Sequence, residues 1–261
     1  MTREQLLVIS GSILLLLTLY CGFDTKSTKQ RREIEQRELR GIQVDVVPII
    51  KAAKESLAVD DLKEVEKLEV GQELVQNPTA RLEALKMLSG AWYRHKRFLI
   101  AGHYAQKVAE IDSTDEAWSI AGTTYFAGIT GEDPMISNAC FDRAVECLEY
   151  AISLNSAEIS HRVNLALVYT RRPTQENPMQ GIQMLLQLNE NFPDNVLVLT
   201  TLGRLAIETK QWDRARERLE HAVEIESDNT RAICLLAEVY QQTGDERSAQ
   251  LKDKCELLTV K

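Results

Sequence analysis

The residues of this chain that could bind a metal ion or attack a substrate are its cysteines and histidines, and both types are scattered. An odd number of cysteines without a C-x-x-C pair indicates neither a zinc site nor a disulfide framework. We therefore expect small apolar core residues at Cys21, Cys140, Cys147, Cys234 and Cys255. The histidines are His95, His103, His161 and His221. Their spacing favours surface or core positions over a shared site.

The sequence motifs of common enzymes are absent as well. There is no glycine-rich phosphate loop, no H-E-x-x-H and no G-x-S-x-G. We therefore expect no enzymatic activity, no cofactor, no metal and no small-molecule substrate. A net charge of −8 argues against nucleic acid as a partner, because nucleic-acid binders present a basic surface to the phosphates. Other proteins remain as the expected class of partner.

An apolar run near the start of the chain, Leu6–Phe23, contains no charged residue. It is at the short end of what crosses a hydrocarbon core of about 30 Å, so it predicts a single transmembrane helix. A cleaved signal peptide is disfavoured, because no small-x-small site follows and the bulky Tyr20 precedes Cys21. Basic residues concentrate after the run and favour a body on the cytoplasmic side of a membrane. Interleaved acidic residues leave a periplasmic body as the alternative.

The rest of the chain divides by composition and periodicity. Residues 1–23 form the expected tail and anchor, and residues 24–41 are almost all polar, which predicts a charged helical stalk. From there to the end the apolar spacing is helical and no strand pattern occurs. We expect a degenerate helical pair over residues 42–81 and repeated helical pairs over residues 82–261, an all-α fold. The expected repeats are 82–114, 115–158, 159–195, 196–229 and 230–261.

Glycine within an otherwise helical stretch points to those repeats. In WSIAGTTYF, Gly122 stands in the middle of a predicted helix, where glycine costs about 1 kcal/mol relative to alanine. The same arrangement returns at Gly203, and the segments around Leu202 and Leu236 align at a period of about 34 residues. A small residue at this position would let the two helices of a pair approach closely, which offsets the cost in propensity.

The pattern resembles the tetratricopeptide repeat, whose signature is W-x-x-L-G-x-x-Y in the first helix and A-x-x-x-F-x-x-A in the second. The residues that carry the resemblance are Trp118, Gly122, Tyr125, Gly203, Ala215 and Ala222. The resemblance implies a right-handed α-α superhelix, here preceded by one N-terminal transmembrane helix, as in membrane-anchored bacterial tetratricopeptide proteins. Serine replaces the usual turn proline at Ser113, Ser156 and Ser227. Asp253 and Glu256 stand where apolar residues are usual, so the last helix is expected to be a polar cap.

Two candidate surfaces for partner proteins follow from the repeat pattern. In the family the concave face is lined by fixed positions of the first helices. The resemblance places a partner-binding groove at Thr123, Asn164, Thr201, Arg204 and Arg231. The lysine and asparagine pattern that binds acidic C-terminal tails is not met, because Asn164 stands without the lysines.

The second candidate surface comes from two long turns between paired helices. These are GITGEDPMISN (Gly128–Asn138) and RRPTQENPMQG (Arg171–Gly181). Each carries a residue that commonly caps a helix, followed by proline at the expected first helical position. Turns of stacked repeats lie along one edge, so we expect the two insertions to be neighbours. The expected partner-binding edge consists of Asp133, Pro134, Met135, Asn177, Pro178 and Met179.

Together these features predict a non-enzymatic protein that docks other proteins at the inner face of a bacterial membrane. A periplasmic assembly factor of the same fold, similar to a chaperone, is the alternative. An enzyme is the least favoured reading, because no pair of nucleophile and base has suitable spacing.

Overall fold

The computed structural model describes residues 44–74 and 77–259, and these residues are all helix, turn or loop. The expected transmembrane helix Leu6–Phe23 and the stalk at 24–41 lie outside them. Within the described residues no helix is both long and apolar enough to cross a membrane. The helices are α3 (Val46–Glu55), α4 (Val59–Leu74), α5 (Pro78–Arg94), α6 (Phe98–Asp112), α7 (Asp115–Phe126), α8 (Pro134–Leu154), α9 (Ile159–Arg171), α10 (Gln180–Asn191), α11 (Val196–Glu208), α12 (Trp212–Ile225), α13 (Thr230–Thr243) and α14 (Ser248–Thr259).

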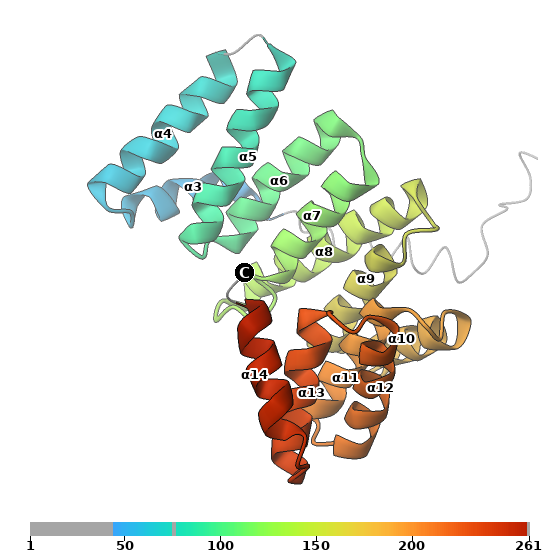
Figure 1. The fold of residues 1–261 in the computed structure, drawn as a ribbon. Coiled ribbons are helices and arrows are strands. Elements are labelled where there is room, and N and C mark those ends of the chain that lie inside the picture. Colours follow the sequence, from blue (N-terminus) through green and yellow to red (C-terminus); the bar gives the residue numbers. More distant parts are fainter. Residues whose placement is uncertain (1–43, 75–76, 260–261) are drawn as a thin grey trace, which may run out of the picture. The chain divides into compact units, whose positions relative to one another are not determined.

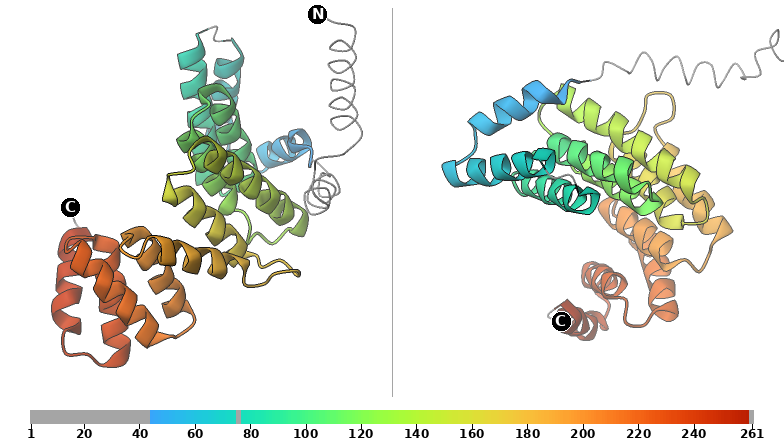
Figure 2. Two further views of the ribbon diagram at one scale, coloured as in Figure 1. Left: turned by 90° about the vertical axis from the view of Figure 1, so that its right-hand side faces the viewer. Right: turned by 90° about the horizontal axis from the view of Figure 1, so that it is seen from above.

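The helices pack as consecutive pairs, which Figures 1 and 2 show from three directions. Each of α5, α7, α9, α11 and α13 packs on the helix that follows it, and α6, α8, α10 and α12 each contact the next pair. In addition, α9 contacts both α7 and α11, and α11 contacts α13. The all-α prediction is confirmed for the described residues. The expected degenerate region holds α3, α4 and the start of α5, since α5 begins at Pro78.

Local sequence signals set the ends of these helices. The side chains of Asn77, Thr114, Asn195 and Asn229 each accept a hydrogen bond from a backbone N–H in the first turn of the following helix. Such caps satisfy donors that a helix leaves open at its start. At the other end, Gly244 terminates α13 in the left-handed conformation with φ of 70°, which glycine adopts without strain.

The glycines in the first helices of two pairs allow close contact with the second helices. A Cβ atom at Gly122 would lie 2.6 Å from Cγ of Leu148 on α8. A Cβ atom at Gly203 would lie 2.7 Å from Cγ of Leu219 on α12. Both leucines are fully buried, so the contact that each glycine permits belongs to the core. This packing is the physical reason for a helix-interior glycine at both places.

The other residues of the repeat signature also pack inside the pairs. Tyr125, Ala215 and Ala222 are buried. Trp118 is only partly buried, and its ring packs against Tyr150 on α8 with the centroids 4.6 Å apart. Apolar clusters follow the pairs along the chain, with one over α3 to α6, one over α9 to α11 and one over α11 to α14.

The last helix does not follow the register of the other second helices. Ala249, which is equivalent to Ala215 at the repeat period of about 34 residues, is exposed, whereas Leu251, Cys255 and Leu258 are partly buried. These three residues are four and three positions apart and so share one face of α14. Burying this face removes more apolar surface from water than burying Ala249 would, so α14 packs through it. Asp253 and Glu256 are exposed, in agreement with a polar outer surface.

The prediction that the cysteines form no disulfide is wrong for one pair. Cys234 on α13 and Cys255 on α14 are joined by a disulfide, with their Cα atoms 5.0 Å apart. The two residues are separated by 21 positions in the sequence, which matches no spacing motif. The antiparallel packing of α13 and α14 is what brings them together. Cys140 and Cys147 are free and buried, as expected for core residues.

Candidate functional site

The structure brings only part of the predicted groove to the surface. Thr123 is partly buried, and its hydroxyl donates to the carbonyls of Ser119 (2.9 Å) and Ile120 (3.0 Å) in its own helix. Asn164 on α9 reaches Ser119 on α7, with 3.5 Å between Nδ2 and Oγ. Both side chains are therefore engaged within the fold, and Asn164 joins the neighbouring first helices α7 and α9.

Thr201 requires a correction. Its side chain is 1% exposed, so it is not available to a partner. The cause is the packing of α11 between α9 and α13, which contact it on either side. The buried Oγ1 has no hydrogen-bond partner within the described residues.

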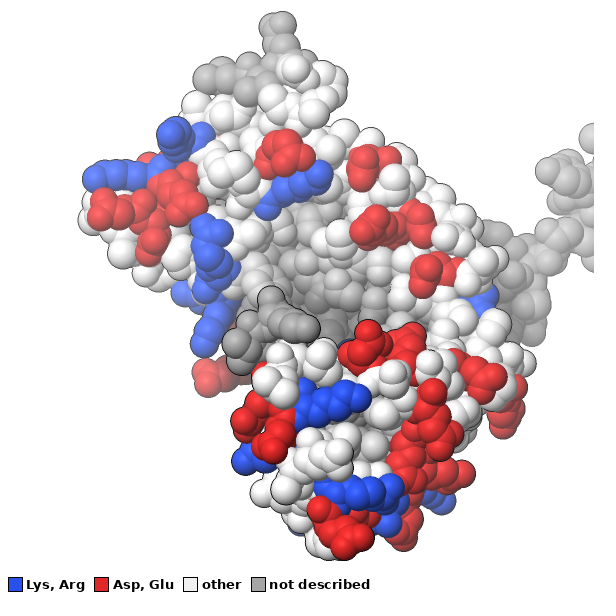
Figure 3. All heavy atoms as spheres, in the orientation of Figure 1, with Lys and Arg blue, Asp and Glu red and all other residues white. Residues whose placement is uncertain are grey.

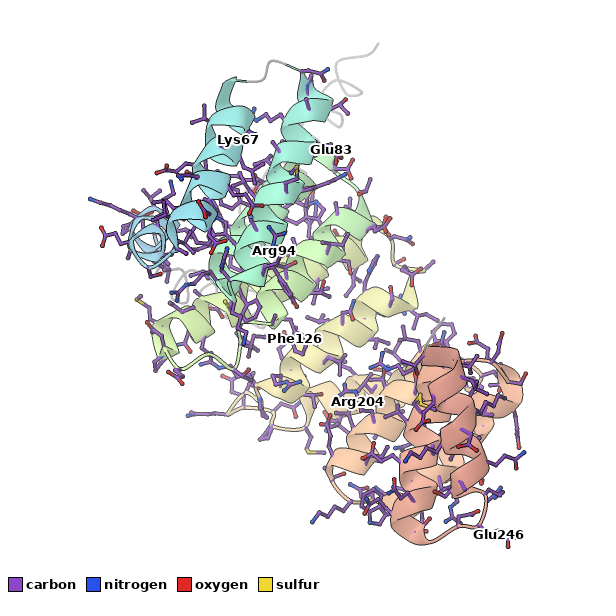
Figure 4. All side chains as sticks on the ribbon, turned by 60° about the vertical axis from the view of Figure 1, so that its left-hand side comes forward. Lys67, Glu83, Arg94, Phe126, Arg204 and Glu246 are labelled. Carbon is purple, nitrogen blue, oxygen red and sulfur yellow. A yellow bond between two sulfur atoms is a disulfide. The ribbon has the colours of Figure 1, made fainter. Side chains whose placement is uncertain are left out.

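The two groove arginines lie close to one another. Arg204 pairs with Glu208 one turn later on α11, and its side chain is 24% exposed. Arg231 on α13 has no ion pair within the described residues, and its pKa is lowered by partial burial and by the positive charge of Arg204. The groove thus offers one unpaired cation next to one that is already paired. Figure 4 labels Arg204, and Figure 3 shows acidic and basic side chains interspersed over α11 to α14.

Hydrogen bonds close the first long turn. Asp133 caps α8 by accepting hydrogen bonds from the backbone N–H groups of Met135 (2.8 Å) and Ile136 (3.4 Å). The hydroxyl of Ser137 donates back to the carbonyl of Ile129 and closes the loop. Pro134 occupies the first helical position, as the sequence predicts. The fixed start of α8 leaves Met135 53% exposed.

The second long turn ends differently from the prediction. Helix α10 begins at Gln180, so Asn177 does not cap it and Pro178 lies in the turn before it. Instead, Nδ2 of Asn177 donates to Oε1 of Gln183 (3.1 Å), and Thr174 bonds to the backbone of Asn177. The backbone N–H of Gln180 donates to the carbonyl of Asn177 (3.1 Å), so a turn separates Asn177 from the start of α10. Met179, at the end of this turn, is 53% exposed.

Arginines at the start of the second turn stack on aromatic rings beside the first turn. The guanidinium of Arg171 lies 5.5 Å from the ring centre of Phe126, the last residue of α7. The guanidinium of Arg172 lies 5.4 Å from the ring centre of Phe141 on α8. Stacking of this kind is worth about 0.5–1 kcal/mol at exposed sites. The two turns are therefore held side by side, as the repeat pattern predicts, and Figure 4 labels Phe126 at the end of α7.

We call this surface the long-turn edge and define it by Phe126, Met135, Arg171, Arg172 and Met179. Neither arginine has a carboxylate partner within the described residues, and Nη1 of Arg172 is buried without a hydrogen-bond partner there. The two methionines are each more than half exposed. The edge thus combines flexible apolar side chains with positive charge that is not neutralised inside the described part of the chain. The arginine stacks have no signal in the sequence, because only the fold places them near the rings.

A partly buried hydrogen bond between a histidine and a carboxylate joins the first helices of two neighbouring repeats. His161 on α9 is 3% exposed, and its Nε2 lies 2.9 Å from Oδ2 of Asp115 at the start of α7. Asn155 donates to the same oxygen at 3.0 Å. These hydrogen bonds, that of His161 first, lower the pKa of Asp115 from its ordinary value of 3.8.

This pair gives a prediction about pH. Because the folded-state pKa is lowered, ionised Asp115 contributes stability above pH 3.8, and the contribution is lost as the pH falls through the folded-state value. Asp115→Asn is therefore expected to lower the melting temperature at neutral pH, and the difference from the wild type should shrink as the pH falls below 3.8. Thermal unfolding of both proteins over that range measures it. A difference that stays constant with pH would contradict the assigned role.

Burial shifts the pKa values of two cysteines and one histidine in the directions that disfavour their charged forms. Burial raises the pKa of the Cys140 and Cys147 thiols to about 12, whereas nucleophilic cysteines have lowered values. Burial, with the charges of Lys107 and Arg143, lowers the pKa of His103 to about 4. Within the described residues no group of three or more histidine, cysteine or acidic side chains is placed to hold a metal ion.

Comparisons with known proteins give limited similarity. No protein-family model matches the chain, and no curated protein matches it. Among solved structures, one titled "MamA MSR-1 C2" is 19% identical with a TM-score of 0.38, over 69% of this chain and 97% of that one. A structure of BtubC from P. vanneervenii is 16% identical with a TM-score of 0.45, over 80% of this chain and 91% of that one. At these identities and TM-scores neither a function nor a partner follows for this chain.

Proposed function

We propose that this chain is a non-enzymatic docking protein, built from tetratricopeptide-like repeats in a right-handed superhelix and tethered to a membrane by Leu6–Phe23. The observation that carries the proposal is the long-turn edge. Two insertions that the repeat itself does not need are held together by arginine–aromatic stacks and expose Met135 and Met179. These turns carry exposed methionines and arginines without a carboxylate partner within the described residues, which suits a partner segment with apolar side chains flanked by carboxylates.

The groove of Arg204 and Arg231 is the second candidate surface. Arg231 is exposed and lacks an ion pair within the described residues. However, Thr201 is buried, and Thr123 bonds within its own helix. Arg204 pairs with Glu208, although its buried Nε has no hydrogen-bond partner within the described residues. The long-turn edge therefore has the better support.

Replacement of both edge methionines tests the proposal. Met135→Glu with Met179→Glu should reduce crosslinked capture of partner proteins from membranes by roughly tenfold or more. The new carboxylates would replace apolar contacts with the partner and would repel the partner's own acidic groups. Met87→Glu is the matched control, because Met87 on α5 is 56% exposed but lies in another repeat. All three proteins should have the same helical content by circular dichroism.

If the edge variant captures partners as the wild type does, while Arg204→Gln with Arg231→Gln loses that capture, the docking surface is the groove and not the edge. Binding should also weaken with added salt, because the expected attraction is between exposed charges.

The disulfide gives an argument about which side of the membrane the helical repeats occupy. Disulfides persist in oxidising compartments and are rare in the cytoplasm. Cys234–Cys255 therefore favours the periplasmic alternative over the cytoplasmic placement that the basic flanks suggest. A reporter that works only after export, fused after Lys261, should be active. If the export reporter is inactive and a reporter that works in the cytoplasm is active, the repeats lie in the cytoplasm.

A further inference from the structure

The terminal helix α14 is held at its two ends by different means. At its start, Arg247 in the α13–α14 turn stacks on Tyr240 at 4.3 Å and pairs with Glu220 (3.1 Å) and Asp245 (2.8 Å). No residue of α14 itself is fully buried. Leu251 packs against the apolar cluster formed by α11, α12 and α13. The part of α14 beyond Leu251 is held by the Cys234–Cys255 disulfide, by a hydrogen bond from Lys254 Nζ to the carbonyl of Ser227 (2.6 Å) and by the partly buried Leu258.

Charged residues of both signs lie near the disulfide in the sequence: Arg231 and Glu238 flank Cys234 on α13, and Lys254 and Glu256 flank Cys255 on α14. Arg231 lies three residues before Cys234 on α13, so the two side chains share one helix face. Arg231 has no ion pair within the described residues, and burial together with the nearby charge of Arg204 lowers its pKa. Lys254 precedes Cys255, but its Nζ donates to the carbonyl of Ser227, so Arg231 is the cation that shares a helix face with a cysteine of the disulfide. Cations next to a cysteine stabilise its thiolate, which makes it a better leaving group and favours the reduced form. Both cysteines are only partly buried, so an external thiol can reach the bond.

We propose that Cys234–Cys255 is a thiol–disulfide exchange site that acts as a latch on α14 and is opened by a dithiol reductant. A thiolate of the reductant attacks Sγ of Cys255, the bond to Cys234 breaks, and Cys234 leaves as a thiolate stabilised by Arg231. The second thiol of the reductant, as its thiolate, then attacks the reductant's own sulfur in the mixed disulfide and releases Cys255. Two electrons pass to the protein, its two sulfurs take up the two protons that the dithiol gives up, and the reductant leaves as its disulfide. The reverse sequence closes the latch.

Opening should free the part of α14 that follows the anchored turn. The Arg247 contacts with Tyr240 and Glu220 do not involve the disulfide, so the start of the helix stays in place. The long-turn edge belongs to α7–α10 and contains no residue of this pair, so the latch is independent of the proposed docking surface.

Reduction of the full-length chain in detergent by dithiothreitol tests the latch. Alkylation and mass spectrometry should show Cys234 and Cys255 protected before reduction and both labelled afterwards. Arg231→Gln should slow the reduction by about threefold at neutral pH, because the leaving thiolate loses its neighbouring cation. Arg81→Gln, which removes the same charge from the exposed surface of α5, should leave the rate unchanged. Hydrogen exchange of α14 should rise on reduction while that of α7–α9 stays constant.

Three results would overturn the proposal: alkylation of both cysteines without reductant, equal reduction rates in the wild type and Arg231→Gln, or unchanged hydrogen exchange of α14 after reduction. Cys234→Ser with Cys255→Ser provides an independent open state. Its α14 should exchange as in the reduced wild type, and protection equal to that of the oxidised protein would contradict a latch.

Discussion

Replacing Gly181 by alanine is expected to lower the free energy of unfolding by about 3 kcal/mol, at the upper end of what overpacking costs. A Cβ atom at this position would lie 2.3 Å from the carbonyl oxygen of Ala166 and 2.5 Å from the backbone nitrogen of Thr170. These are backbone atoms of α9, which cannot rotate away as a side chain can. The first turn of α10 must therefore move off α9, and the buried contacts of Leu185 and Leu188 loosen with it.

The matched control is Gly71→Ala in α4, where a new Cβ atom would meet nothing within 4 Å. Here alanine is expected to stabilise the protein by about 0.8 kcal/mol through helix propensity alone. Urea unfolding followed by circular dichroism measures both changes. Equal effects of the two substitutions would mean that α9 and α10 do not approach as closely as the structure shows.

Replacing Gly122 by leucine is expected to destabilise the protein by about 1 to 3 kcal/mol. A Cβ atom at Gly122 would lie 2.6 Å from Cγ of Leu148 and 3.2 Å from the carbonyl oxygen of Ala144. Leu148 is fully buried, so it cannot make room without displacing its own neighbours. The melting temperature should fall clearly.

Gly90→Leu serves as the comparison for this second substitution. Gly90 lies within α5, and a Cβ atom there would meet only the end of the flexible Arg94 side chain, at 3.9 Å. The same leucine should therefore be tolerated at Gly90. An unchanged melting temperature for Gly122→Leu would count against the repeat register from which the paired helices were predicted.

The sequence was sufficient for the features that arise from local chemistry and periodic spacing. The glycines at 122 and 203 and the cap at Asp133 were predicted correctly, because each follows from the helix in which it stands. The nearness of the two long turns was also predicted, since stacked repeats place equivalent turns on one edge. The arginine stacks that hold those turns could not be foreseen, because arginine–aromatic contacts between repeats follow no spacing rule.

Other features depended on competition between neighbouring helices. Thr201 was expected at the surface and is buried, because α11 lies between two other first helices. In α14 the face of Leu251, Cys255 and Leu258 overrode the register implied by Ala249. That rotation is also what directs Cys255 toward Cys234, so the disulfide could not be predicted without it.

Site-specific photo-crosslinking tests the long-turn edge most directly. A photoreactive residue is placed at Met135 or Met179 on the edge, and at Thr123 or Asn164 in the groove, in the protein inside its own cells. The account predicts covalent adducts with partner proteins from positions 135 and 179 and none from positions 123 and 164. Adducts from the groove positions alone would contradict it.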